Sequence, residues 1–338
     1  MNSILSLFSS DIITTGNQYY FSRLTDEQKK VYKSILSSVK VRAKKIKMPL
    51  RPINEIAKIF TYMLLDYPML FYVSPSFQQS SDLYKKKCII IPTYNYSRSE
   101  ANAYYNEVMK CLRALDSVKN KSDIDKELYV HDFCLNNFEY DYTFGEHSHS
   151  ILGLALNKKA VCESIAKFVK LAFDYIGIKS LVVSGKAKNP ALDSGLEGHS
   201  WNIVRINGAT HHLDVTFDMT IKDKILRYDY FNLCDKEIKK DHVIVDDVPA
   251  CDATGSDYYS VNALTINRLS ELDNYIGKAL KQRNRHILVK IKNEPYSDGV
   301  ADKVMNIAQR QFSTHGSGST MIETSYNASQ MVFEIIFK

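Results

Sequence analysis

The sequence predicts an α+β fold, and three observations support this prediction. Apolar residues recur at helical spacing through residues 161–176, which is typical of a strongly amphipathic helix. The pair Asn207-Gly208 lies between two strand-like segments and favours a tight antiparallel hairpin. Helix and strand signals mix in the first third of the chain and again after residue 262.

The first third of the chain begins with helix signals. Thr25, followed three residues later by Gln28, predicts a capping box that begins a helix over 24–39. A second helix is predicted over 54–68, where Pro68 ends the apolar stripe. Strands are predicted at 69–74 and 87–94, followed by a long helix over 97–118.

The middle and the end of the chain continue the mixed pattern. A helix is predicted over 125–142, and the amphipathic helix that follows is expected to end at Gly177. A strand over 180–187 precedes the hairpin over 199–218. After a boundary within 249–260, the remaining predicted elements are a helix over 268–282, a strand over 286–293, a helix over 300–312 and a strand over 331–338.

The charge, the hydropathy and the cysteines of the chain indicate which partners and which location to expect. The 338 residues carry a formal net charge of +6, and the basic runs at 40–51 and 85–87 lack interleaved aromatic residues, so no nucleic-acid partner is predicted. No apolar run approaches the length of a membrane span. The six cysteines are scattered without a CxxC pair, which indicates a reduced, cytoplasmic location. The alternative is a secreted or cell-surface location, if the sequence is part of a longer secreted chain.

The predicted hairpin brings a histidine and an aspartate to one side of a sheet. With Asn207 and Gly208 as the two loop residues, His199 lies opposite Thr216, and Asp214 is its diagonal neighbour on the same face. A loop longer or shorter by one residue would reverse this parity, so the prediction depends on the turn.

Cys162 lies at the start of the amphipathic helix, where the helix dipole favours a thiolate. A thiol, an imidazole and a carboxylate supply a nucleophile, a base and a group that orients the base. We therefore predict Cys162, His199 and Asp214 as catalytic residues. A packing role for Cys162 is the alternative.

The segments around these residues resemble the transglutaminase-like superfamily of papain-type cysteine enzymes. The resemblance rests on "AVCESIAKFVKLAFDYIGI", "GHSWNIVRING" and "HHLDVTFD", in this order, and is strongest over 130–220. The lead-in "HDFCLNNFEYDY" is similar to bacterial members, and the first third resembles a region attached to this domain in Gram-positive bacteria. The resemblance implies a papain-like core, in which the helix that carries Cys162 packs on an antiparallel sheet between small α+β regions.

The resemblance also suggests residues of the substrate site. Tyr140 and Asp141 match a Tyr-Asp pair near the family's cleft, and Trp201 shares a strand face with His199. We expect these three residues to bind substrate, with packing and capping as the alternatives. Phe217 stands where the family usually has tryptophan, and Ser164 where many members have glycine, so the pocket is expected to differ in shape.

The domain ranges that follow from these predictions are 1–120, 121–255 for the transglutaminase-like core, and 256–338. The expected activity is that of a thiol enzyme on amides of a peptide or protein substrate, by transfer to an amine or by hydrolysis. The alternative is a peptide- or cell-envelope-binding module with a vestigial core.

No cofactor is predicted. No metal is predicted either, because the histidines at 147, 149, 211 and 212 lack a helical HxxxH spacing or a cysteine partner.

Overall fold

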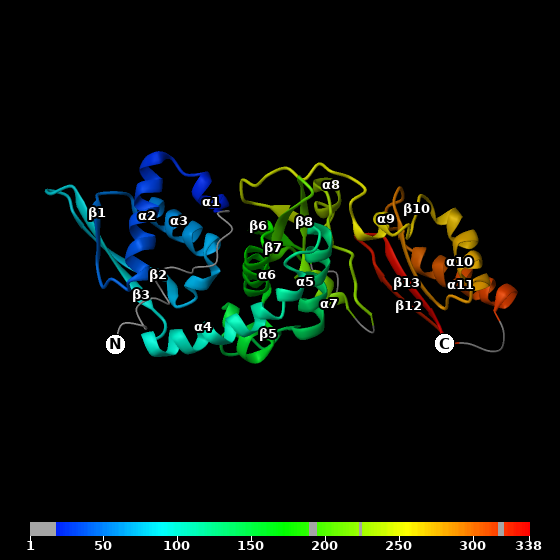
Figure 1. Ribbon diagram of the computed structural model, residues 1–338. Helices are drawn as coiled ribbons and strands as arrows, with labels where there is room; N and C mark the ends of the chain where they lie inside the picture. The colour runs from blue at the N-terminus through cyan, green and yellow to red at the C-terminus, as the bar shows by residue number, and fades with distance from the viewer. Residues whose placement is uncertain (1–17, 189–194, 223–224, 317–320) are drawn as a thin grey trace. The chain divides into compact units, whose positions relative to one another are not determined.

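The computed structural model describes residues 18–188, 195–222, 225–316 and 321–338 (Figure 1). Contacts divide the chain into two compact units, Met1–Val183 with Ser200–Ala209, and Ser184–His199 with Thr210–Lys338. Helices and strands mix within each unit, which confirms the predicted α+β class. The three predicted domain ranges stay predictions.

The N-terminal part of the first unit combines helices with an antiparallel sheet of order β1-β3-β2. The predicted capping box is confirmed, because the side chains of Thr25 and Gln28 each bond the other residue's backbone N–H. The elements of this part are α1 (Tyr19–Ser22), α2 (Asp26–Lys40), β1 (Ile46–Pro49), α3 (Ile53–Asp66), η1 (Pro68–Leu70), β2 (Val73–Asp82), β3 (Lys87–Tyr94) and α4 (Arg98–Arg113).

The strand predicted over 69–74 is wrong at its start. Pro68 begins the 3₁₀ turn η1 instead, and β2 begins only at Val73. Proline suits the first turn of a helix, since it has no N–H to donate there and its φ is already fixed. The turn packs Met69 and Leu70 into the interior, where both are nearly inaccessible.

The remainder of the first unit leads to the helix of Cys162. Its elements are η2 (Asp116–Val118), α5 (Asp123–Asn137), β4 (Glu139–Tyr140), η3 (Gly153–Asn157), β5 (Lys159–Ala160) and α6 (Cys162–Ile176). The apolar face of α6 is buried, and Gly177 ends the helix with φ of 86°, as predicted.

Helix α6 packs on strands β6 (Lys179–Ala187) and β7 (Glu197–Ile206). The buried Asn202 side chain of β7 donates to Ala166 O of α6 at 2.9 Å and to Leu181 O of β6 at 3.2 Å. These strands belong to a sheet of order β8-β7-β6-β9. Asn207 and Gly208, with φ of 50° and 88°, form the predicted turn between β7 and β8 (Ala209–Leu213).

The second unit ends in a sheet of order β10-β11-β13-β12, with α10 and α11 contributing to its core. Its buried core includes Ile276, Val289, Val304 and Ile335. The elements after β8 are α7 (Val215–Ile221), α8 (Asp235–Ile238), β9 (His242–Ile244), α9 (Tyr258–Val261), β10 (Thr265–Ile266), η4 (Leu269–Glu271), α10 (Leu272–Lys281), β11 (His286–Ile291), α11 (Val300–His315), β12 (Ile322–Asn327) and β13 (Val332–Phe337).

Among the helices that the structure describes, none combines the length and the apolar character that crossing a bilayer would require.

Candidate active site

Cys162 is the first residue of α6 and is partly exposed, whereas the other five cysteines of the chain are buried. The preceding residue, Val161, is the N-cap and has no side-chain oxygen to bond the first N–H groups of the helix. The first backbone N–H groups of a helix have no acceptor within it. The thiol therefore lies at the positive end of the α6 dipole, where an anion is stabilised.

The start of α6 is fixed by the segment that precedes it. Ser148 O accepts hydrogen bonds from Val161 N at 3.2 Å and from Ser164 Oγ at 2.8 Å. Gly153 allows this close packing, because a Cβ there would lie 2.5 Å from Lys159 O. The side chain of Ser164 thus anchors the helix start.

Asp141 organises the loop that leads to Ser148. Its carboxylate accepts from Thr143 N at 2.9 Å, Thr143 Oγ1 at 2.6 Å, Gly145 N at 2.9 Å and the Ser148 hydroxyl. The hydrogen bonds from Ser148 and Thr143 hold the pKa of Asp141 below its usual value. These hydrogen bonds make Asp141 a structural anchor for the loop that leads to the Cys162 helix, while substrate binding by Asp141 stays a prediction.

The other two predicted substrate residues are placed differently. Tyr140 lies in β4, is half-buried, and its ring packs at 4.8 Å from the ring of Tyr142. Trp201 is only 1% exposed on β7, so its side chain presents almost no surface to a ligand in this structure. The burial of Trp201 favours the packing alternative.

A cavity of about 540 Å³ borders the first turns of α6. Its walls come from α3, η1, the segment at 145–151 and α6 itself, which contributes Glu163 and Lys167. These two α6 residues form an ion pair at 2.5 Å, while Phe71 and Pro75 supply apolar surface. The cavity therefore combines apolar and charged groups, and its wall includes Glu163, the residue that follows Cys162.

His199 and Asp214 meet in the second unit. His199 Nε2 lies 2.6 Å from Asp214 Oδ2, and the two side chains are 7% and 0% exposed. The predicted contact is therefore present. Asp214 is not a strand residue, however: β8 ends at Leu213, and Asp214 is the N-cap of α7, where its Oδ1 accepts from Phe217 N at 3.0 Å. Aspartate is a favoured N-cap, which explains why the strand stops one residue earlier.

The ring of Phe217 covers the histidine, with ring centroids 4.4 Å apart. The Phe217 ring also packs against the rings of Tyr230 and His242. The His199–Asp214 pair is thus shielded from water, which strengthens its hydrogen bond.

A second histidine, which the sequence did not indicate, also contacts Asp214. His242 Nε2 lies 3.0 Å from Asp214 Oδ2, and His242 Nδ1 lies 2.7 Å from Asp241 Oδ1. No helical or strand periodicity connects His242 to the hairpin, because it lies 28 residues after Asp214 and enters through β9. The Asp-His dipeptide at the start of a short strand is a local signal.

The charges of this cluster depend on one another. Burial alone would raise the pKa of Asp214, but the charges and hydrogen bonds of His199 and His242 prevail and hold that pKa below its usual range. Burial likewise opposes the charged form of His242, yet Asp214 and Asp241 raise its pKa above the usual value. The contribution of protonated His242 to the stability of the fold is therefore fully present below about pH 6.5. It is lost as the pH rises through the raised pKa of His242.

Two clusters in the described part of the chain have donor atoms within 4.8 Å of one another, the distance at which they could hold one metal ion. They are His199 with Asp214 and His242, and His212 with Asp235 and Cys251. In both clusters the histidine nitrogens already lie 2.6 to 3.0 Å from a carboxylate oxygen. Hydrogen bonds between the histidines and the carboxylates account for these short distances, and we assign no metal to either cluster.

Burial distinguishes several other thiols from Cys162. It raises the pKa of Cys111 and Cys234, and it raises the pKa of Cys251 to about 12. A buried thiol with a raised pKa is a poor nucleophile near neutral pH. These cysteines are therefore suitable internal controls for the reactivity of Cys162.

The structure brings His199 and Asp214 together within the second unit, whereas Cys162 belongs to the first. Hydrogen bonds hold the side chains of His199 and Asp214. The approach of the thiol to the histidine stays a prediction.

Comparisons with known proteins match the middle of the chain. The family model described as the transglutaminase-like superfamily matches residues 112–214, a range that contains Cys162, His199 and Asp214. A search of the curated proteins found no match.

Solved structures show weaker likenesses. The "Crystal structure of a TGase" is 13% identical with a TM-score of 0.31, covering 54% of this chain and 53% of that one. A "Putative Cysteine Protease from Cytophaga hutchinsonii" is 12% identical with a TM-score of 0.28, covering 43% of this chain and 63% of that one. A protein described as a "putative protease" from Parabacteroides distasonis is 14% identical with a TM-score of 0.25, covering 40% and 30%. Each match spans less than two thirds of the solved chain, and TM-scores this low add no argument.

Proposed function

Since residues 112–214 belong to the transglutaminase-like superfamily, we propose that the chain is a thiol enzyme that acts on peptide or side-chain amides through an acyl-enzyme on Cys162. The observation that carries the proposal is the buried hydrogen bond from His199 Nε2 to Asp214 Oδ2 at 2.6 Å. This bond commits Nε2 to the carboxylate, so Nδ1 is the nitrogen that would take the thiol proton.

The proposed reaction proceeds in two halves. The thiol proton moves to His199 Nδ1, and Cys162 Sγ attacks the carbonyl carbon of the amide. The C–N bond then breaks, the leaving amine takes the proton from His199, and a thioester remains on Cys162. In the second half, a primary amine or water loses a proton to His199 and attacks the thioester carbonyl carbon. The C–S bond then breaks, and the thiolate takes the proton back from His199, which restores the thiol.

The position of Cys162 supports stabilisation of the oxyanion in both halves. Its own backbone N–H, at the first position of α6, points along the positive end of the helix dipole and would donate to the developing negative charge. The adjacent cavity at Glu163 and Lys167 would receive part of the acyl donor, and its Phe71 and Pro75 surface favours an apolar group.

Capture of the thioester tests this proposal. The protein would be incubated with a peptide library rich in glutamine, with and without a labelled primary amine, quenched in acid and mapped by mass spectrometry. We expect an acyl adduct on Cys162, together with either labelled amide or free acid as product. The labelled amide identifies acyl transfer, and the free acid identifies hydrolysis.

Cys111→Ala is the matched control, because Cys111 is a thiol near an ammonium group, Lys158 Nζ, at 3.8 Å. This variant should form the adduct at the wild-type level, whereas Cys162→Ala should form none. Product formation by Cys162→Ala at the wild-type rate would contradict the proposal and favour a binding module with a vestigial core.

A further inference from the structure

His242 lies between two carboxylates in the interior of the second unit. Its side chain is 0% exposed, with Nε2 3.0 Å from Asp214 Oδ2 and Nδ1 2.7 Å from Asp241 Oδ1. A carboxylate oxygen only accepts hydrogen bonds, and a neutral imidazole has a single N–H to donate. Both contacts are satisfied together when the ring carries a proton on each nitrogen.

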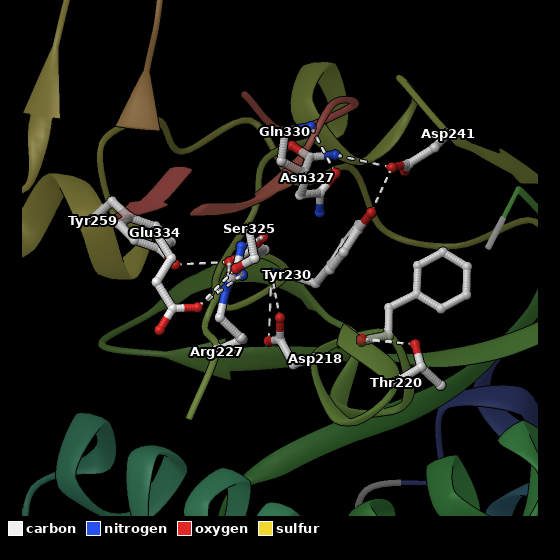
Figure 2. Close-up of polar contacts among 12 residues, drawn as sticks. Asp218, Thr220, Arg227, Tyr230, Asp241, Tyr259, Ser325, Asn327, Gln330 and Glu334 are labelled. Carbon is white, nitrogen blue, oxygen red and sulfur yellow. Dashed lines mark hydrogen bonds and ion pairs between the residues drawn. The ribbon is translucent and has the colours of Figure 1, made fainter. Parts of the chain in front are cut away.

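Asp241 is itself held in place from its far side. Tyr230 OH donates to Asp241 Oδ2 at 2.7 Å, and Gln330 Nε2 lies 3.4 Å from the same oxygen (Figure 2). Gln330 Nε2 also donates to Glu237 O at 3.2 Å. The C-terminal region, which supplies Gln330, thus fixes the carboxylate that faces His242 Nδ1.

The titratable groups around His242 come from several elements. Asp241 precedes β9, Asp214 is the N-cap of α7, and His199 lies on β7 with its ring centroid 5.5 Å away. Tyr230 also lies nearby, with its ring centroid 5.7 Å away, and so does His212 of β8, whose burial lowers its pKa to about 4 and keeps it neutral. The two carboxylates are therefore the charged partners that decide the protonation of His242.

We propose that His242 is a buried imidazolium and a positioning residue of the catalytic centre, which holds Asp214 Oδ2 in place and offsets its charge next to His199. The inference rests on the proposed function, in which His199 is the base. Asp214 Oδ2 is shared by His199 and His242, so His199 pairs with a carboxylate whose charge is largely neutralised.

The expected consequence concerns how tightly His199 holds a proton. A full carboxylate charge would make the His199 imidazolium a weak acid that gives up its proton reluctantly to a leaving amine. The nearby cation of His242 counteracts this effect. Two unit charges 5.5 Å apart shift each other's titration by about two pH units at an effective dielectric constant of about 20.

The test is a ¹⁵N NMR titration of the labelled histidines in the full chain with Cys162→Ala, so that the thiol does not contribute. We expect both ring nitrogens of His242 to be protonated at pH 7. We also expect His242→Gln to move the titration midpoint of His199 upward by at least about one pH unit.

His212→Gln is the matched control, because it removes another buried histidine that pairs with a carboxylate, Asp235, at 3.0 Å. This control should leave the His199 midpoint in place. Asp241→Asn, which keeps the His242 ring and removes one of its carboxylates, provides a second variant if His242→Gln does not fold. It should lower the pH at which His242 loses its proton.

A His242 ring with one proton at pH 7, or a His199 midpoint that is the same in His242→Gln and in the Cys162→Ala parent, would overturn the inference. An unchanged His242 titration in Asp241→Asn would overturn it as well. These outcomes are separate from a failure of the proposed function, which would appear as a missing thioester on Cys162 in the otherwise unaltered protein.

Discussion

Cys162→Ala is expected to lower the rate of amide turnover by about six orders of magnitude, because the variant lacks the thiol on which the proposed acyl-enzyme forms. His199→Ala should cost nearly as much, and the double variant little more than either single one, since nucleophile and base act as one unit. Asp214→Asn should lower the rate by about four orders of magnitude, because the amide no longer holds His199 in the required tautomer. Steady-state kinetics on a substrate from the peptide library would measure these effects.

The Cys111→Ala variant serves again as the control and should keep the wild-type rate. Circular dichroism would establish that each variant is folded. A Cys162→Ala protein that keeps more than about a tenth of the wild-type rate would mean that the thiol is not the nucleophile.

Arg227→Met is expected to destabilise the protein by about 3–5 kcal/mol, because breaking a buried ion pair leaves the partner charge without compensation. Arg227 is 2% exposed and forms an ion pair with the fully buried Asp229 at 2.7 Å. Removing the guanidinium leaves the Asp229 charge buried, with Tyr259 OH at 2.7 Å as a remaining donor. Arg227 Nη1 also contacts Ser325 Oγ at 3.2 Å, so the variant loses a link to β12 (Figure 2).

Urea unfolding of the wild-type protein and of Arg227→Met at pH 7 would measure the decrease in the free energy of unfolding. Arg310→Met is the matched control, because Arg310 pairs with Asp273 at the same 2.7 Å while the two side chains are 62% and 45% exposed. An exposed pair contributes at most about 1 kcal/mol. Equal losses in the two variants would show that burial of the Arg227 pair has no energetic importance.

The contact between His199 and Asp214 was predictable because hairpin geometry is local. Asn207 and Gly208 adopt the positive φ values that the two-residue turn requires, and side chains alternate along the strands that leave it. The helix of Cys162 was predictable for the same reason. The spacing of its apolar residues and the glycine that ends it, Gly177, both lie within one continuous segment of the sequence.

Features that depend on distant residues were not predictable in this way. The sequence predicted Asp214 as a strand residue. In the structure it accepts a hydrogen bond from Phe217 N as the N-cap of α7, which explains why β8 stops before it. His242 reaches Asp214 because β9 pairs with β6, placing Ala187 opposite His242, and no periodicity in the sequence determines that pairing. The contact between Arg227 and Ser325 spans 98 residues, and buried polar pairs of this kind leave no local pattern.

We propose that His199 activates Cys162, and the rate of alkylation at pH 6 measures this activation. At this pH an ordinary thiol, which titrates near 8.5, is less than about 1% thiolate and reacts slowly with iodoacetamide. Mass spectrometry would follow adducts on all six cysteines in the wild-type protein and in His199→Ala. We expect Cys162 of the wild type to be alkylated at least about tenfold faster than Cys162 of the variant, and well before the five buried cysteines. Equal rates of Cys162 alkylation in the two proteins would mean that His199 does not activate the thiol.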